Sequence, residues 1–179
     1  MKKYGLMAVL LAGLGFACQR EGNFPEVTNM PVEQSESGEK KPIAAGILLG
    51  QMIFDSVAYE VPQEKMLQPF IKEFGDGTVV DVAMIKRVQA TKKDKPYYYV
   101  VGIGQKNGDF RMMALELYAS EDNSLYVTSK SRKYISTSND CDFCMFTYDK
   151  NVITGAECQS RDATTECTYA VEESNTFMR

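Results

Sequence analysis

Apolar side chains follow a helical spacing in one segment of the chain. They recur on one stripe of a helix: Met66, Leu67, Phe70, Ile71 and Phe74. Pro62 suits the first turn and Gly75 the C-terminal cap, so the pattern predicts a helix over residues 62–74. Pro69 removes a backbone donor inside this helix, so we expect a kink there or two short helices joined near Gln68.

The segments that follow are rich in β-branched and aromatic residues. They predict four strands, over residues 79–88, 97–104, 110–118 and 124–128. Turn-prone residues separate them, and the dipeptide of Asn107 and Gly108 is a strong hairpin signal. Strands joined by such short loops are antiparallel neighbours. The sequence therefore predicts an α+β fold, with the amphipathic helix packed on one face of a four-stranded antiparallel meander.

This order of elements is similar to that of the cystatin-like and nuclear-transport-factor-like folds, in which a curved antiparallel sheet wraps around a helix. The Gln-x-Val-x-Gly motif of the cystatin protease inhibitors does not occur in the chain. The similarity therefore implies an arrangement of elements and no activity.

The first 17 residues have the pattern of a secretion signal. Lys2 and Lys3 precede an uncharged stretch from Tyr4 to Ala17, which is 14 residues long. At about 1.5 Å per residue, a helix of that length is well short of the roughly 30 Å hydrocarbon core of a membrane. We therefore expect residues 1–17 to be a signal peptide and not a permanent transmembrane span.

The residues before Cys18 resemble the lipobox of bacterial lipoprotein precursors, in which the cysteine becomes the first mature residue and is lipidated. Ala17 fits the position before the cysteine, whereas Gly15 stands where leucine is usual and Phe16 is bulky for its position. Ordinary secretory cleavage after Ala17 and a retained anchor are the alternatives. Ordinary cleavage would leave an odd thiol, and lipidation of Cys18, which the resemblance implies, accounts for that thiol.

Composition divides the mature chain into a tether and one domain. Residues 18–42 are rich in polar and charged residues and contain three prolines, which predicts a lipidated N-terminus followed by a flexible tether. Residues 43–179 can form a single domain with its own core. Within it, residues 43–54 are dense in apolar side chains, and periodicity leaves a buried helix and an early strand equally open.

The charge balance of the mature chain is acidic. Without the signal peptide, 18 Lys and Arg stand against 24 Asp and Glu, a net charge of −6. A modest acidic excess argues against a nucleic-acid partner.

Four cysteines lie within residues 141–167: Cys141, Cys144, Cys158 and Cys167. Disulfides are one interpretation, because exported proteins mature in an oxidising compartment. Zinc is a second, although the last two cysteines lack the close spacing of a zinc ribbon. Redox chemistry by Cys141-x-x-Cys144 is a third, although no βαβ context is predicted around it. We expect disulfides, with no metal and no cofactor.

A hairpin formed by residues 143–149 and 152–159 would turn about Asn151. It would place Cys144 opposite Cys158 and leave Cys141 to pair with Cys167. Each disulfide would stabilise this C-terminal hairpin by roughly 3 kcal/mol.

The chain contains no histidine, which excludes Ser-His-Asp and Cys-His catalysis and histidine-ligated zinc. The sequence patterns of nucleophile elbows, P-loops and dinucleotide-binding loops are absent as well. Paired carboxylates can meet from anywhere in a sequence. Six acids are candidates for such a pair, and we expect them to be solvated surface residues: Glu60, Glu64, Asp81, Glu116, Asp140 and Asp142.

Three consecutive tyrosines open the second predicted strand. Alternation places Tyr97 and Tyr99 on one face and Tyr98 on the other, so at least one is expected to be exposed. An exposed aromatic strip can stack on the rings of a ligand, whereas packing in the core is the favoured alternative.

These observations favour a non-catalytic domain that binds or supports a partner. The lipoprotein resemblance implies attachment to a membrane of the bacterial cell envelope, on the periplasmic or surface side of the outer membrane. The alternative is a thiol-redox or metal-binding protein of the envelope that uses the cysteine cluster.

Overall fold

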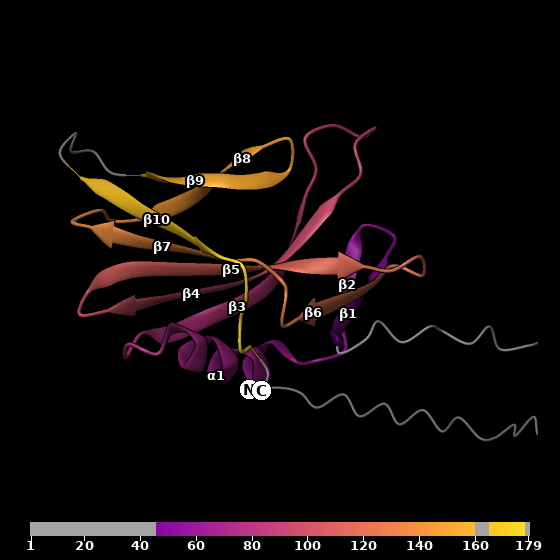
Figure 1. Cartoon of the computed structure of the whole chain (residues 1–179), viewed down its shortest axis with the longest axis horizontal. Coiled ribbons are helices and arrows are strands. Elements are labelled where there is room, and N and C mark those ends of the chain that lie inside the picture. The colour runs from indigo at the N-terminus through magenta and orange to yellow at the C-terminus, as the bar shows by residue number, and fades with distance from the viewer. Residues whose placement is uncertain (1–45, 160–164, 178–179) are drawn as a thin grey trace, which may run out of the picture. The chain divides into compact units, whose positions relative to one another are not determined.

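Ten strands and one helix make up the part of the chain that the computed structural model describes, residues 46–159 and 165–177 (Figure 1). In chain order they are β1 (Gly46–Ile53), β2 (Ser56–Tyr59), α1 (Gln63–Phe74), β3 (Val79–Val88), β4 (Tyr97–Lys106), β5 (Asp109–Ala119), β6 (Ser124–Thr128), β7 (Lys133–Asn139), β8 (Cys144–Asp149), β9 (Val152–Cys158) and β10 (Glu166–Glu172). The fold is mostly β, so the expected α+β fold with a four-stranded meander is wrong. The expected signal peptide, Cys18 and the tether lie outside the described residues.

Helix α1 corresponds to the helix predicted over residues 62–74, and its apolar stripe is turned to the core. Met66 and Phe70 are fully buried. Gly75 ends the helix in the left-handed conformation, with φ 64°, and its N–H donates to the Ile71 carbonyl at 3.2 Å. The helix runs through Pro69 as one element, so of the two expected outcomes, a kink or two short helices, the division into two helices is wrong.

The four predicted strands are present as β3, β4, β5 and β6, and each pairs antiparallel with the next. Asn107 and Gly108 form the β4–β5 turn with φ values of 54° and 93°. A two-residue turn with positive φ at both positions matches the twist of the flanking strands. Residues 46–53, for which helix and strand were both open, form the strand β1.

The sheet branches at β5, so the four predicted strands are part of a larger branched sheet and not a separate four-stranded meander. β4 pairs with one edge of β5, whereas two strands share the other edge. β7 pairs with residues 111–115 there, and β6 pairs only with Tyr118 and Ala119. From this point β6 leads to β1 and β2, and β7 leads to β10.

The branch made of β3, β4, β5, β7 and β10 has another layer packed on each face (Figure 1). On one face, α1 packs so closely that a Cβ on Gly102 of β4 would lie 2.5 Å from the Phe70 ring. On the other face, the hairpin of β8 and β9 packs over a second apolar cluster, which includes Tyr99, Met112, Tyr134 and Phe146. The sheet is therefore the middle of three layers.

A partly buried ion cluster joins the C-terminal segment to α1, β7 and β10. Glu73 accepts hydrogen bonds from the N–H and the hydroxyl of Thr176 at 2.8 and 2.7 Å. The Lys133 ammonium lies 2.8 Å from both Glu73 and Glu172. Burial disfavours the charge of Lys133, but hydrogen bonds and attraction from these two carboxylates raise its pKa. Lys133 and Glu73 form a buried ion pair, Glu172 at its edge is half exposed to solvent, and we assign the cluster a structural role.

Asp76 holds the turn between α1 and β3. Its carboxylate accepts hydrogen bonds from the Thr78 hydroxyl at 2.6 Å and N–H at 3.1 Å, and from the Arg111 guanidinium at 2.7 Å. Burial alone would raise the pKa of Asp76, but the hydrogen bonds from Thr78 and the charge of Arg111 outweigh it and lower this pKa to about 2. The charged form of Asp76 therefore stabilises the folded state.

The Asp76→Asn variant is expected to be less stable than the wild type by about 1 kcal/mol near neutral pH. We expect no more because 26 % of the Asp76 side chain is exposed and solvent screens its interactions. A carboxyl group whose pKa is lowered by folding stabilises the folded protein at pH values above its unfolded pKa, here near 3.8. This contribution is lost as the pH falls towards 2. Urea unfolding of both proteins across this pH range measures the difference, and a gap that stays constant down to about pH 2 would contradict the assignment.

Candidate functional site

The four C-terminal cysteines form two disulfides, but not in the predicted pairs. Cys141 is bonded to Cys158 and Cys144 to Cys167, each with its Cα atoms 5.9 Å apart. The predicted hairpin is present as β8 and β9, and Cys144 lies opposite Cys158 in its register. The register was therefore right, whereas the predicted pairing of Cys144 with Cys158 and of Cys141 with Cys167 is wrong.

Strand β10 accounts for the pairing that forms. It pairs with β7 and sets Cys167 opposite Ser138. Cys144 is fully buried and belongs to the same apolar cluster as Tyr134 of β7, so its side chain is turned to the layer that carries Cys167. The sequence pattern predicts neither β7 nor β10, so it does not indicate that Cys167 approaches Cys144.

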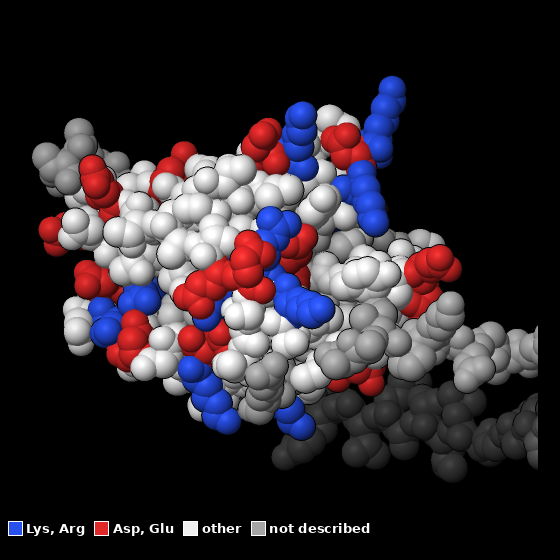
Figure 2. Space-filling view, in the orientation of Figure 1, with Lys and Arg blue, Asp and Glu red and all other residues white. Residues whose placement is uncertain are grey.

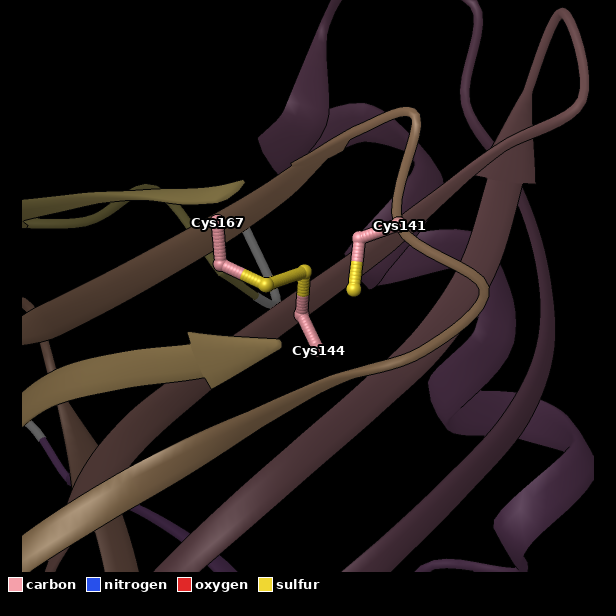
Figure 3. A group of neighbouring side chains, drawn as sticks. All are labelled: Cys141, Cys144 and Cys167. Carbon is pink, nitrogen blue, oxygen red and sulfur yellow. A yellow bond between two sulfur atoms is a disulfide. The ribbon is translucent and has the colours of Figure 1, made fainter. Parts of the chain in front are cut away.

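The Cys141 sulfur lies beside the disulfide of Cys144 and Cys167 (Figure 3). The Sγ atoms of Cys141, Cys144 and Cys167 all lie within 4.8 Å of one another, and within the described ranges they are the one group of three or more Cys, Asp or Glu that could share a metal ion. A sulfur in a disulfide is neither a thiolate ligand nor a nucleophile. In this oxidised state the bonds join β9 to the loop before β8, and β8 to β10.

The three tyrosines at the start of β4 do not form an exposed aromatic surface. Tyr98 and Tyr99 are buried, and Tyr97 is half-buried. The Tyr99 hydroxyl donates to the Asn151 carbonyl at 3.0 Å, and burial raises the pKa of Tyr99 above its ordinary value. Packing in the core is therefore the role of Tyr98 and Tyr99.

The six acids considered for catalysis are spread over α1, β3, β5, the loop after β2 and the loop between β7 and β8. Glu116 is half-buried, and its carboxylate accepts from Nε of Arg132 at 3.1 Å. The others are exposed surface residues, as expected: Glu60, Glu64, Asp81, Asp140 and Asp142.

An apolar groove of about 410 Å³ lies between β8 and the face of β3 and β4. Its walls are apolar and aromatic except for Lys86 and Arg87 on β3: Met84, Ile85, Val101, Ile103, Met112, Phe143, Met145, Phe146 and Tyr148. Phe143 and Met145 remain 38 % and 40 % exposed. The hairpin thus leaves part of the β3–β4 face uncovered.

The groove is bordered by two edge strands. Among the described strands, β8 pairs only with β9, and β3 pairs only with β4. This site was not predicted from the sequence. A signal was present, because exposed Phe143 and Met145 alternate with buried Cys144 and Phe146, so β8 is apolar on both faces.

A second, more polar groove of about 380 Å³ lies where β6 and β7 diverge from β5. Tyr97 and Tyr118 line it together with the cations Lys95, Lys130 and Arg132. The negative charge of Glu116 is the main cause of the raised pKa of Arg132. This attraction outweighs burial, which disfavours the charged form.

No protein-family model, no curated protein and no solved structure matches this chain. Over residues 46–159 and 165–177, no helix has both the length and the apolar character needed to cross a membrane.

Proposed function

We propose that this chain is a non-catalytic binding module of the bacterial cell envelope, attached to a membrane by lipid on Cys18, and that it holds an apolar partner in the groove between β8 and the β3–β4 face. The pattern before Cys18 supports the anchor, and two disulfides fit a domain that matures in an oxidising compartment. Acidic and basic side chains are interspersed on the face seen in Figure 2, without the single-sign field that a nucleic acid would require.

The groove is the observation that carries this proposal. Large apolar side chains exposed singly are ordinary on a protein surface, whereas exposed apolar side chains gathered in a concave site mark binding. Here exposed Phe143 and Met145 line one groove with Met84 and Ile103. The second groove is lined by more polar side chains and offers less apolar surface to a partner.

An uncharged, environment-sensitive dye such as Nile red tests the groove. We expect saturable binding to the wild type and about tenfold weaker binding to the double variant Met84→Gln/Met145→Gln, because each change replaces an apolar wall by an amide.

Val171→Thr is the matched control for the dye experiment, since Val171 is 43 % exposed on β10 and does not line the groove. This variant should bind the dye like the wild type. Equal binding by all three proteins, or no binding by the wild type, would overturn the proposal.

A thiol-redox or metal-binding protein is the second candidate, supported by the three Sγ atoms within 4.8 Å of one another. The intact mass of protein extracted from membranes without reductant separates the two candidates. A lipid-modified chain that lacks the hydrogens of four thiols and carries no metal agrees with the binding module. Free thiols or a bound metal would favour the second candidate.

A further inference from the structure

We propose that the second groove, where β6 and β7 diverge from β5, binds an acidic sugar, a pyranose ring with an anionic substituent. The ring lies against Tyr97 and Tyr118, and Arg132 and the two lysines of the groove hold the anionic group. This inference goes beyond the proposed function. It concerns a different surface, since no residue lines both grooves, and it does not depend on the apolar one.

The charge of the second groove favours an anion. Lys95, Lys130 and Arg132 line it, and among the described residues Glu116 is the one acid in its lining. Glu116 is already paired with Arg132, with 3.1 Å between its carboxylate and Nε. Lys95 and Lys130 are exposed, and neither ammonium has an ion-pair or hydrogen-bond partner in the described part of the chain. The groove therefore carries uncompensated positive charge on a chain whose net charge is −4.

Arg132 is oriented to bind an anion. Glu116 accepts a hydrogen bond from its Nε, and the Glu116 N–H donates to the Arg132 carbonyl at 3.0 Å, so side chain and backbone are both held. Neither of its terminal Nη groups donates to an acceptor within the described ranges, and the side chain is 40 % exposed. A guanidinium binds an anionic group through two parallel N–H donors of this kind.

Two buried asparagines fix the loops that carry the cations. Asn175 is 5 % exposed, and its amide donates to two carbonyl groups of the turn between β6 and β7, each at 2.8 Å. This turn contains Lys130. Asn151 is 4 % exposed, and its amide donates to the Lys95 carbonyl at 3.1 Å. The backbone on both sides of the groove is thus ordered before a ligand binds, which lowers the entropy lost on binding.

Tyr97 and Tyr118 give the groove its aromatic surface. Each lies one residue beyond the pair of Tyr98 with Leu117, so they are neighbours on one face of the β4–β5 pair. Tyr97 is half-buried and Tyr118 is 55 % exposed, and neither hydroxyl has a hydrogen-bond partner among the residues that the structure describes.

This aromatic surface suits a sugar. A tyrosine presents an apolar ring and a polar hydroxyl, as a sugar presents apolar C–H faces and hydroxyl groups. Both tyrosines lie on one side of the groove, so they cover one face of a ligand ring, whereas a heterocycle is usually stacked between two walls. The volume of about 380 Å³ is within the range of ligand sites, roughly 300–1,000 Å³.

The probe is the trimer of galacturonic acid, titrated calorimetrically into the purified full chain at low salt. We expect saturable binding that weakens about tenfold or more when the carboxylates of the trimer are methyl-esterified, because esterification removes the charge and keeps the rings. Citrate has three carboxylates and no ring, so at equal concentration it should not displace the trimer.

The Lys95→Gln/Lys130→Gln variant should bind the trimer about tenfold more weakly than the wild type, and Tyr118→Thr should bind it several-fold more weakly. Lys65→Gln/Lys72→Gln is the matched control. It removes the same charge from exposed positions of α1 that do not line the groove, so it should bind like the wild type.

No saturable binding of the trimer, equal binding of its methyl ester, or unchanged binding by Tyr118→Thr would overturn the inference. Equal weakening by both double lysine variants would show that net charge attracts the anion without the groove, and would overturn it as well. Tighter binding of adenosine monophosphate than of the trimer would overturn the sugar in favour of an aromatic anion. The apolar groove is tested separately, because its dye binding should be unchanged in Lys95→Gln/Lys130→Gln.

Discussion

Exchange of all four C-terminal cysteines for alanine is expected to leave the domain largely unfolded in buffer in which the wild type is folded. The two disulfides join residues that lie 17 and 23 positions apart in the sequence. In the chain-entropy model, each cross-link of this length stabilises a protein by about 3 kcal/mol. Their sum is comparable with the whole stability of a small domain, which is about 5–15 kcal/mol.

Urea unfolding without reductant, followed by circular dichroism, measures this effect. The variants Cys141→Ala/Cys158→Ala and Cys144→Ala/Cys167→Ala each keep one disulfide and should each lose about 3 kcal/mol. Cys18→Ser keeps both disulfides and should unfold like the wild type. An unchanged midpoint in the fourfold variant would show that the disulfides do not stabilise the domain. Mapping of the non-reduced protein should recover fragments linked through Cys141–Cys158 and Cys144–Cys167.

The Gly104→Ala variant should also be severely destabilised, by about 3 kcal/mol or more. A Cβ at Gly104 would lie 1.9 Å from the carbonyl oxygen of Val79 and 2.8 Å from the Cα of Val80. The register of β3 on β4 shifts between Val80 and Val82, at this same point. The clash is with backbone, which no change of rotamer relieves, so β3 would have to move off β4.

Gly155→Ala is the control for this prediction, because a Cβ there meets only the Thr147 hydroxyl, at 3.0 Å, and a side chain can rotate. Its loss of stability in urea unfolding should be well under that of Gly104→Ala. Similar losses in both variants would mean that β3 does not lie as close to β4 as we describe.

Elements formed by residues close in sequence were predictable. Helix α1, strands β3 to β6 and the hairpin of β8 and β9 each have a periodic apolar pattern, and their turns contain Gly75, Asn107 or Asn151. Strand β7 has no such pattern, because most of its buried side chains are polar: Lys133, Ser136 and Ser138. Without β7 and β10, four strands in a row were the simplest arrangement, and the branch at β5 was not predicted.

The candidate site shows the same difference between features set by neighbours in sequence and features set by distant segments. The predicted hairpin about Asn151 placed Cys144 opposite Cys158, as in the structure. Alternation did not indicate which faces would be covered, so Tyr98 and Tyr99 were candidates for an exposed surface although both are buried. The groove was not predicted either, because its two walls come from segments about 60 residues apart in the chain.

The order of residues along the chain is sufficient to predict α1 and the hairpins, and to raise the expectation of a signal peptide and an oxidised cysteine cluster. These features depend on residues that are neighbours in sequence. The branch of the sheet, the pairing of the cysteines and the groove depend on contacts between distant segments: β1 with β6, β5 with β7, and β7 with β10. An apolar pattern indicates that a face is buried but does not identify the segment that packs against it. The partner of each face was settled by how the whole domain packs, and β8 was left with one edge and part of one apolar face uncovered.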